Sequence, residues 1–142
     1  MPVVNPTRAQ FDAMLAMPAG EPVYMLNLLR FREQADYGER DDIEACSGRE
    51  AYARYGAGIA GILQEVGGHP VWQGDAQLSF IAPEGEVWDE CLLVRYPDVK
   101  AFQAMLTNPD YQAQTFHRDA ALLDARLVIT HTALVDFPKD GL

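Results

Sequence analysis

Residues 22–31 have the sequence PVYMLNLLRF, which predicts a β-strand. Side chains alternate between the two faces of a strand, and here both faces are largely apolar. A strand of this kind is buried on both sides. One face has Val23, Met25, Leu29 and Phe31 around a single amide, Asn27, and the other has Tyr24, Leu26 and Leu28.

Capping signals place the helices around this strand. Thr7 and Gln10 have capping-box spacing and begin a helix that continues to about Met17. Ser47 and Glu50 repeat the spacing after a polar loop, residues 32–46, and begin a long helix that ends at residues 67–68, Gly-Gly. Further caps predict a helix from residue 98 and another from residues 108–109 that continues to about residue 124.

Three more strands are expected downstream of the long helix. The second covers residues 69–73 and resumes at 77–82 after a break at residues 74–75. A turn at residues 83–86 leads to the third strand, residues 87–96, and the last strand covers residues 126–137. On the last strand both faces are again apolar.

Without the first helix, the element order is β-α-β-β-α-β. This order predicts an α+β, ferredoxin-like fold with a four-stranded antiparallel sheet and helices on one face. We expect one domain over residues 1–142, with an extra N-terminal helical extension at 1–20 and a core at 22–137. The helices can bury only one of the two apolar faces of the sheet. We therefore expect the second face to be buried against an identical subunit, which predicts a dimer.

The composition limits the classes of function. The 142 residues carry a formal net charge of −10, with 21 acidic and 11 basic residues, which argues against binding nucleic acid or anionic membranes. A small anionic ligand at a local arginine stays compatible with this charge. The N-terminus lacks the pattern of a signal peptide, no apolar run is long enough to span a bilayer, and Cys46 and Cys91 have no metal-binding or disulfide spacing. We therefore expect a cytoplasmic protein without a metal or a bound cofactor.

A series of short motifs resembles a known family. The motifs are NLLRF at residues 27–31, YARY at 52–55, GG at 67–68, VRYP at 94–97 and NPDYQA at 108–113, followed by Arg118. In this order and spacing, from about Val23 to Val135, they resemble the domain-of-unknown-function 1330 family of the dimeric α/β-barrel superfamily. The resemblance implies a homodimer whose sheets face one another and a cleft in each subunit between sheet and helices. The N-terminal helix and the loop at 32–46 depart from the family pattern.

Two groups of residues are candidates for binding a ligand in that cleft. Asn27 lies in an apolar strand, where a buried amide needs partners, either a ligand or the neighbouring backbone. Arg118 follows Tyr111 by seven positions, so the two side chains can share a helix face and bind a carboxylate beside an aromatic wall. The alternative is a surface Arg118 paired with an acid such as Asp119 or Asp124.

His117 is the candidate for moving a proton, since histidine titrates near neutral pH. The haem-degrading members of the superfamily use an asparagine on the first strand, a tryptophan near the end of the third and a histidine on the last helix. By resemblance these positions correspond to Asn27, Tyr96 and His117, with tyrosine replacing the tryptophan.

Three functions remain open. The first is a cofactor-free enzyme of the isomerase or monooxygenase type acting on a small anionic compound. Asn27 would orient a carbonyl, and Tyr96, Tyr111, His117 and Arg118 would complete its site. The second is a non-catalytic ligand-binding or interaction dimer that uses the same cleft. The third is a haem-binding or haem-degrading protein.

Overall fold

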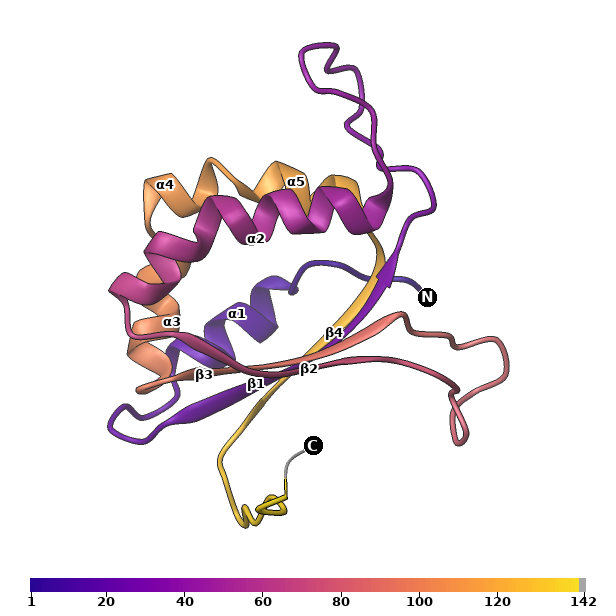
Figure 1. Cartoon of the computed structure of the whole chain (residues 1–142). Helices are drawn as coiled ribbons and strands as arrows, with labels where there is room; N and C mark the ends of the chain where they lie inside the picture. The colour runs from indigo at the N-terminus through magenta and orange to yellow at the C-terminus, as the bar shows by residue number, and fades with distance from the viewer. Residues whose placement is uncertain (141–142) are drawn as a thin grey trace.

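The computed structural model describes residues 1–140 of the chain and contains the predicted four-stranded antiparallel sheet (Figure 1). Its strands are β1 (Val23–Phe31), β2 (His69–Asp75), β3 (Glu90–Tyr96) and β4 (Leu122–Thr130). They are arranged in the order β2-β3-β1-β4, and every neighbouring pair is antiparallel. This order confirms the ferredoxin-like arrangement expected from the β-α-β-β-α-β sequence of elements.

The helices lie on one side of the sheet (Figure 1). The long helix α2 (Gly48–Glu65) packs beside α4 (Pro109–Gln112) and α5 (Thr115–Ala121), and α3 (Val99–Leu106) lies near the end of β3. The predicted capping box of α2 is present, with the Ser47 hydroxyl accepting from the Glu50 amide and the Glu50 carboxylate accepting from the Ser47 amide. Local side-chain chemistry therefore sets where α2 begins.

The N-terminal helix α1 (Arg8–Leu15) lies between the helical layer and the sheet (Figure 1). Its predicted capping box, Thr7 with Gln10, is also present. Met14 is buried in the main core with Val23 and Met25 of β1, and its carbonyl accepts a hydrogen bond of 3.2 Å from the Gln103 side chain of α3. The extension thus contributes to the core and fills part of the space that the sheet and helices enclose.

The predicted helix at 109–124 is wrong in two respects. It is divided into α4 and α5, and it ends at Ala121, where β4 begins directly at Leu122. Leu122 is 1% exposed and pairs with Phe31. The free energy gained by burying Leu122 in the sheet exceeds what extending α5 by further residues would contribute.

The strand ends are also corrected, because each depends on its partner strand. β4 ends at Thr130 and not at residue 137, since Thr130 already pairs with Tyr24 near the beginning of β1. β2 continues unbroken to Asp75, which pairs with Glu90 at the start of β3, and residues 77–82 form no strand. β3 begins three residues later than predicted, at Glu90, where it pairs with Leu29 of β1 and Asp75 of β2.

Gly48 lies at the point where three elements meet. Its amide donates to the Arg32 carbonyl at 3.0 Å, and the Arg32 amide donates to the Ala121 carbonyl at 2.8 Å. The end of β1, the start of α2 and the end of α5 are thereby tied together backbone to backbone. Such a close approach leaves no room for a side chain.

The face of the sheet opposite the helices is left open (Figure 1). In its central row Leu26 of β1 lies between Leu93 of β3 and Val128 of β4. Leu26 is 38% exposed and Val128 53% exposed. We call this surface the outer face. Within residues 1–140, no helix combines the length and apolar character needed to cross a membrane.

Candidate functional site

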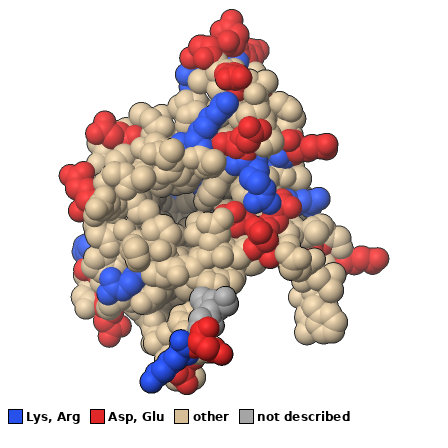
Figure 2. Space-filling model, in the orientation of Figure 1, with Lys and Arg blue, Asp and Glu red and all other residues tan. Residues whose placement is uncertain are grey.

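A cavity of about 980 Å³ separates the helices from the inner face of the sheet. Figure 2 shows a hollow in this region whose surroundings are mostly uncharged. The size falls within the range typical of small-molecule sites. Most of the wall is apolar, and its main contributors are Phe11, Met14, Met25, Ile59, Phe102 and Met105.

A polar group of side chains interrupts this apolar wall. Tyr52 and Tyr55 of α2, Tyr111 of α4, Arg118 of α5 and Asn27 of β1 all line the cavity. The Tyr55 and Tyr111 hydroxyls are 2.8 Å apart and share a hydrogen bond. Small-molecule sites are typically apolar cavities in which a few polar groups fix the orientation of the ligand.

Asn27 is buried, and its side-chain NH2 is used by the protein itself. The Nδ2 atom donates to the Met25 carbonyl at 3.1 Å and to the Leu92 carbonyl at 3.3 Å. Two carbonyl acceptors fix the orientation of the amide and use both of its protons. The remaining Oδ1 atom makes no hydrogen bond to another described residue, so Asn27 can offer a ligand an acceptor rather than the expected donor.

Tyr52 and Tyr55 are held in their protonated form. Burial raises the pKa of Tyr52 to about 12, although nearby Arg118 acts in the opposite direction. Burial also raises the pKa of Tyr55, with the neighbouring Tyr111 adding to the effect. Tyr52 makes no hydrogen bond to another residue in 1–140. At neutral pH its hydroxyl is therefore a donor available to a ligand.

Arg118 lines the cavity, and its hydrogen-bond partners are not Asp119 or Asp124. Its Nη1 atom donates to the Val4 carbonyl at 2.7 Å and to the Asn5 Oδ1 atom at 3.3 Å. Tyr111 also lines the cavity, although α4 and α5 are separate helices and not the single helix that the spacing predicted.

Tyr96 lines the same cavity from the end of β3, where its hydroxyl donates to the Met105 sulfur at 3.7 Å. Burial raises the pKa of Tyr96, so it is also neutral. Tyr96 thus presents mainly its ring to the cavity.

His117 is not among the cavity residues, which differs from its expected place in the cleft. Its Nδ1 atom is 2.7 Å from the Tyr37 hydroxyl of the 32–46 loop, and its ring stacks near Phe116. Burial, followed by the charges of Arg54 and Arg40, lowers the pKa of His117. Arg118, the next residue on α5, lines the cavity, whereas His117 contacts the 32–46 loop. The Asn27–Tyr96–His117 combination implied by haem-degrading relatives does not assemble.

Sequence reasoning missed two parts of the site. Tyr52 and Tyr55 appear in the sequence as members of an ordinary apolar helix stripe, with nothing to mark their hydroxyls as neighbours of Arg118. The segment before α1 was also missed: Val3, Val4, Asn5 and Pro6 line the cavity. Its residues have no periodic pattern from which this position could be predicted.

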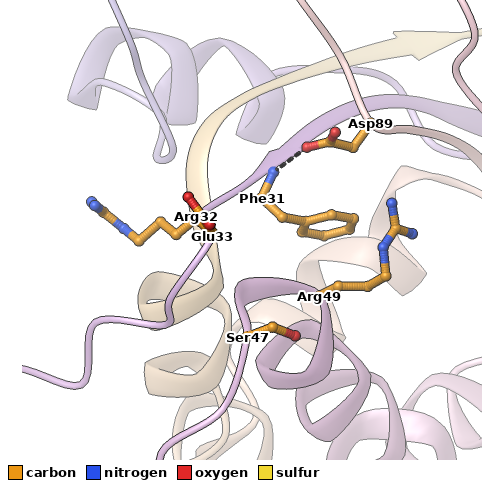
Figure 3. Close-up of a pocket in the computed structure, with 6 residues that line it drawn as sticks. All are labelled: Phe31, Arg32, Glu33, Ser47, Arg49 and Asp89. Atoms are coloured by element: carbon orange, nitrogen blue, oxygen red, sulfur yellow. Dashed lines mark hydrogen bonds between the residues drawn. The ribbon is translucent and has the colours of Figure 1, made fainter.

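A smaller pocket of about 420 Å³ lies where β1 ends and α2 begins (Figure 3). Two of its groups are engaged within the protein: Asp89 accepts from the Phe31 amide at 2.8 Å, and the Arg49 guanidinium lies 4.8 Å from the centre of the Phe31 ring. The Arg32 side chain points away from them (Figure 3). No group of three or more potential metal ligands occurs within residues 1–140.

Comparison with known proteins gives a family but no activity. The model of the family described as domain of unknown function DUF1330 matches residues 44–132. The crystal structure of the methylated RPA0582 protein is 36% identical, with a TM-score of 0.85 over 94% of this chain and 96% of that one. A structure of the RPA0582 protein of unknown function from Rhodopseudomonas palustris is 35% identical, with a TM-score of 0.86 over 95% and 100% of the chains.

A more distant structure comes from Bacteroides fragilis NCTC 9343, a dimeric protein of unknown function with a ferredoxin-like fold. It is 13% identical and covers 78% of this chain and 96% of its own, with a TM-score of 0.49. No curated protein gives a significant match.

Proposed function

The chain belongs to the DUF1330 family, and from that premise we propose that it is a homodimer that binds a small molecule in the cavity of each subunit. The ligand has an apolar, partly aromatic body and an anionic head. The observation that carries the proposal is the cavity of about 980 Å³, whose mostly apolar wall includes Arg118, Asn27 and four tyrosines.

The chemistry of the wall supports this choice of ligand. Phe11, Phe102 and Met105 offer a soft apolar surface to the body of the ligand. Arg118 supplies positive charge, and Tyr52 supplies a hydroxyl donor that no described side chain uses. A carboxylate accepts hydrogen bonds from both kinds of group.

A second candidate is a cofactor-free enzyme of the isomerase type that uses the same ligand. The specific observation in its favour is the group of tyrosine hydroxyls, Tyr52 with the hydrogen-bonded Tyr55–Tyr111 pair, in the same cavity as Arg118. Neutral phenols and a guanidinium are suited to stabilise a developing oxyanion. Turnover of the bound compound would distinguish this enzyme from a binding protein.

The direct test is mass spectrometry of small molecules released from the natively purified protein. We expect a compound with a carboxylate or similar anionic group and an apolar body. Arg118→Ala should weaken its binding about ten- to a hundred-fold, because a hydrogen bond to a charged group contributes about 1.5–3 kcal/mol.

Arg8→Ala is the matched control for that measurement. Arg8 is exposed on α1 and paired with Asp12, outside the cavity, so its loss should leave ligand recovery unchanged. Protein that releases no small molecule and binds no acid in a screen would contradict the proposed function.

The dimer is proposed from the outer face. A sheet with one face open needs cover for the row formed by Leu93, Leu26 and Val128, and an identical outer face can provide it around a two-fold axis. We expect light scattering to give the mass of a dimer at micromolar concentration. A stable monomer under those conditions would be the opposite result.

A further inference from the structure

The chain's own N-terminal segment lines the cavity beside Arg118. We call residues 3–6 the strap. Arg118 donates to the Val4 carbonyl and to Asn5 Oδ1, at 2.7 and 3.3 Å. The Ala125 amide donates to the Val3 carbonyl at 2.7 Å, and the Val3 amide donates to Asp124 Oδ1 at 2.9 Å. The strap is therefore attached to α5 and to the free edge of β4.

Besides these hydrogen bonds the strap has one hydrophobic contact, because Val4 packs against the core cluster that includes Ala121 and Leu122. Val3, Asn5 and Pro6 are exposed, and Val4 is only half-buried. The strap belongs to no helix or strand, whereas the next residue, Thr7, caps α1, and Met14 anchors that helix in the core. The strap can thus detach without disturbing α1.

The Arg118 guanidinium therefore has two alternative partners, the Val4 carbonyl of the strap and the anionic group of a ligand. In this structure it binds a neutral backbone carbonyl, which is a weaker acceptor for a guanidinium than a carboxylate, and a carboxylate can also bind in bidentate fashion. Tyr52 lies in the same cavity with a hydroxyl that can donate to the same head group.

We infer that the ligand's carboxylate replaces the Val4 carbonyl on Arg118 and thereby releases the strap. This inference rests on the proposed function and extends it in two ways. It specifies the ligand head as a carboxylate, and it makes the strap a gate that opens as the site is filled. The strap in the empty protein then acts as an intramolecular competitor of the ligand.

The test compares 2-naphthoate with 2-naphthamide, a neutral probe of nearly the same shape. Calorimetric titration of the full chain should show at least about tenfold tighter binding of the acid. Hydrogen–deuterium exchange should become faster at the Val3 and Ala125 amides, whose hydrogen bonds attach the strap, when 2-naphthoate is bound. Faster exchange indicates release of the strap, because a ligand that only packed against the strap would slow hydrogen exchange there.

Two variants remove the competitor. Deletion of residues 2–5 keeps Thr7 and the helix cap, and it should tighten 2-naphthoate binding about tenfold. Asn5→Ala removes only the longer of the two Arg118 contacts, keeps the full chain, and should tighten binding about twofold. Arg8→Ala should change neither affinity nor exchange.

The outcomes separate the inference from the function beneath it. The inference is wrong if 2-naphthoate binds the full chain and the deletion variant with equal affinity. It is also wrong if the acid binds the deletion variant more weakly and slows hydrogen exchange in the strap of the full chain. In either case the strap is a fixed part of the cavity wall, and the cavity still binds the acid. If the acid and the amide bind alike, the carboxylate assignment is wrong. If neither probe binds any chain, the proposed function fails for this ligand class and the inference fails with it.

Discussion

Replacing Leu26 with aspartate should convert the proposed dimer into a monomer. Leu26 lies at the centre of the outer face, between Leu93 and Val128. A two-fold axis would place two copies of the new carboxylate in one interface. If each unpaired charge costs about 2 kcal/mol on burial, dimerisation weakens about a thousand-fold. Light scattering over a dilution series measures the change.

Leu15→Asp is the control for this substitution. Leu15 is 45% exposed, comparable with 38% for Leu26, but it lies on α1, away from the outer face. We expect Leu15→Asp to remain dimeric. Circular dichroism should show that both variants fold. A dimeric Leu26→Asp variant would mean that the outer face is not the interface.

Gly48→Ala should destabilise the fold by about 3 kcal/mol, at the upper end of the usual cost of overpacking. A Cβ at this position would collide with the Arg32 carbonyl and would lie 2.7 Å from both the Ala121 carbonyl and the Arg32 amide nitrogen. These are backbone atoms held by hydrogen bonds: the Arg32 amide donates to the Ala121 carbonyl, and the Arg32 carbonyl accepts from the Gly48 amide. They cannot move aside without separating the ends of β1 and α5 from α2. Chemical denaturation followed by circular dichroism measures the decrease in the free energy of unfolding.

Gly56→Ala gives the comparison within the same helix. A Cβ at Gly56 meets no atom within 4 Å. Alanine there should stabilise the protein by about 0.5–1 kcal/mol, because it reduces the conformational freedom of the unfolded chain. Equal effects of the two alanines would show that the close approach at Gly48 has been misassigned.

The sequence predicted those features that depend on local chemistry. The caps at Thr7 and Ser47 are formed within four residues, and both are present. The two faces of β1 follow from strict alternation along one strand, and Met25 and Leu29 are buried as their face requires. Together these elements were sufficient to give the order of the fold.

Features that depend on residues far apart in the sequence could not be predicted from local sequence patterns. The end of β4 is set by where β1 begins, and the start of β4 by the burial of Leu122 opposite Phe31. Arg118 and His117 are adjacent in the sequence, and only the packing of α5 on α2 decides which of them faces the cavity. The strap was missed for the same reason, since its partners Arg118 and Ala125 lie more than a hundred residues away.

The sheet order also determines how the chain assembles during synthesis. The central strand β1 is made first among the strands, but its neighbours β3 and β4 begin only at residues 90 and 122. Until β3 is synthesised, the apolar β1 segment of a nascent chain has no strand to pair with, because β2 pairs only with β3. Pairings of such long sequence separation slow folding and leave strand edges open to aggregation. Because β2 and β3 are the paired strands closest in the sequence, we expect them to pair first, with β1 docking on β3 before β4 completes the sheet.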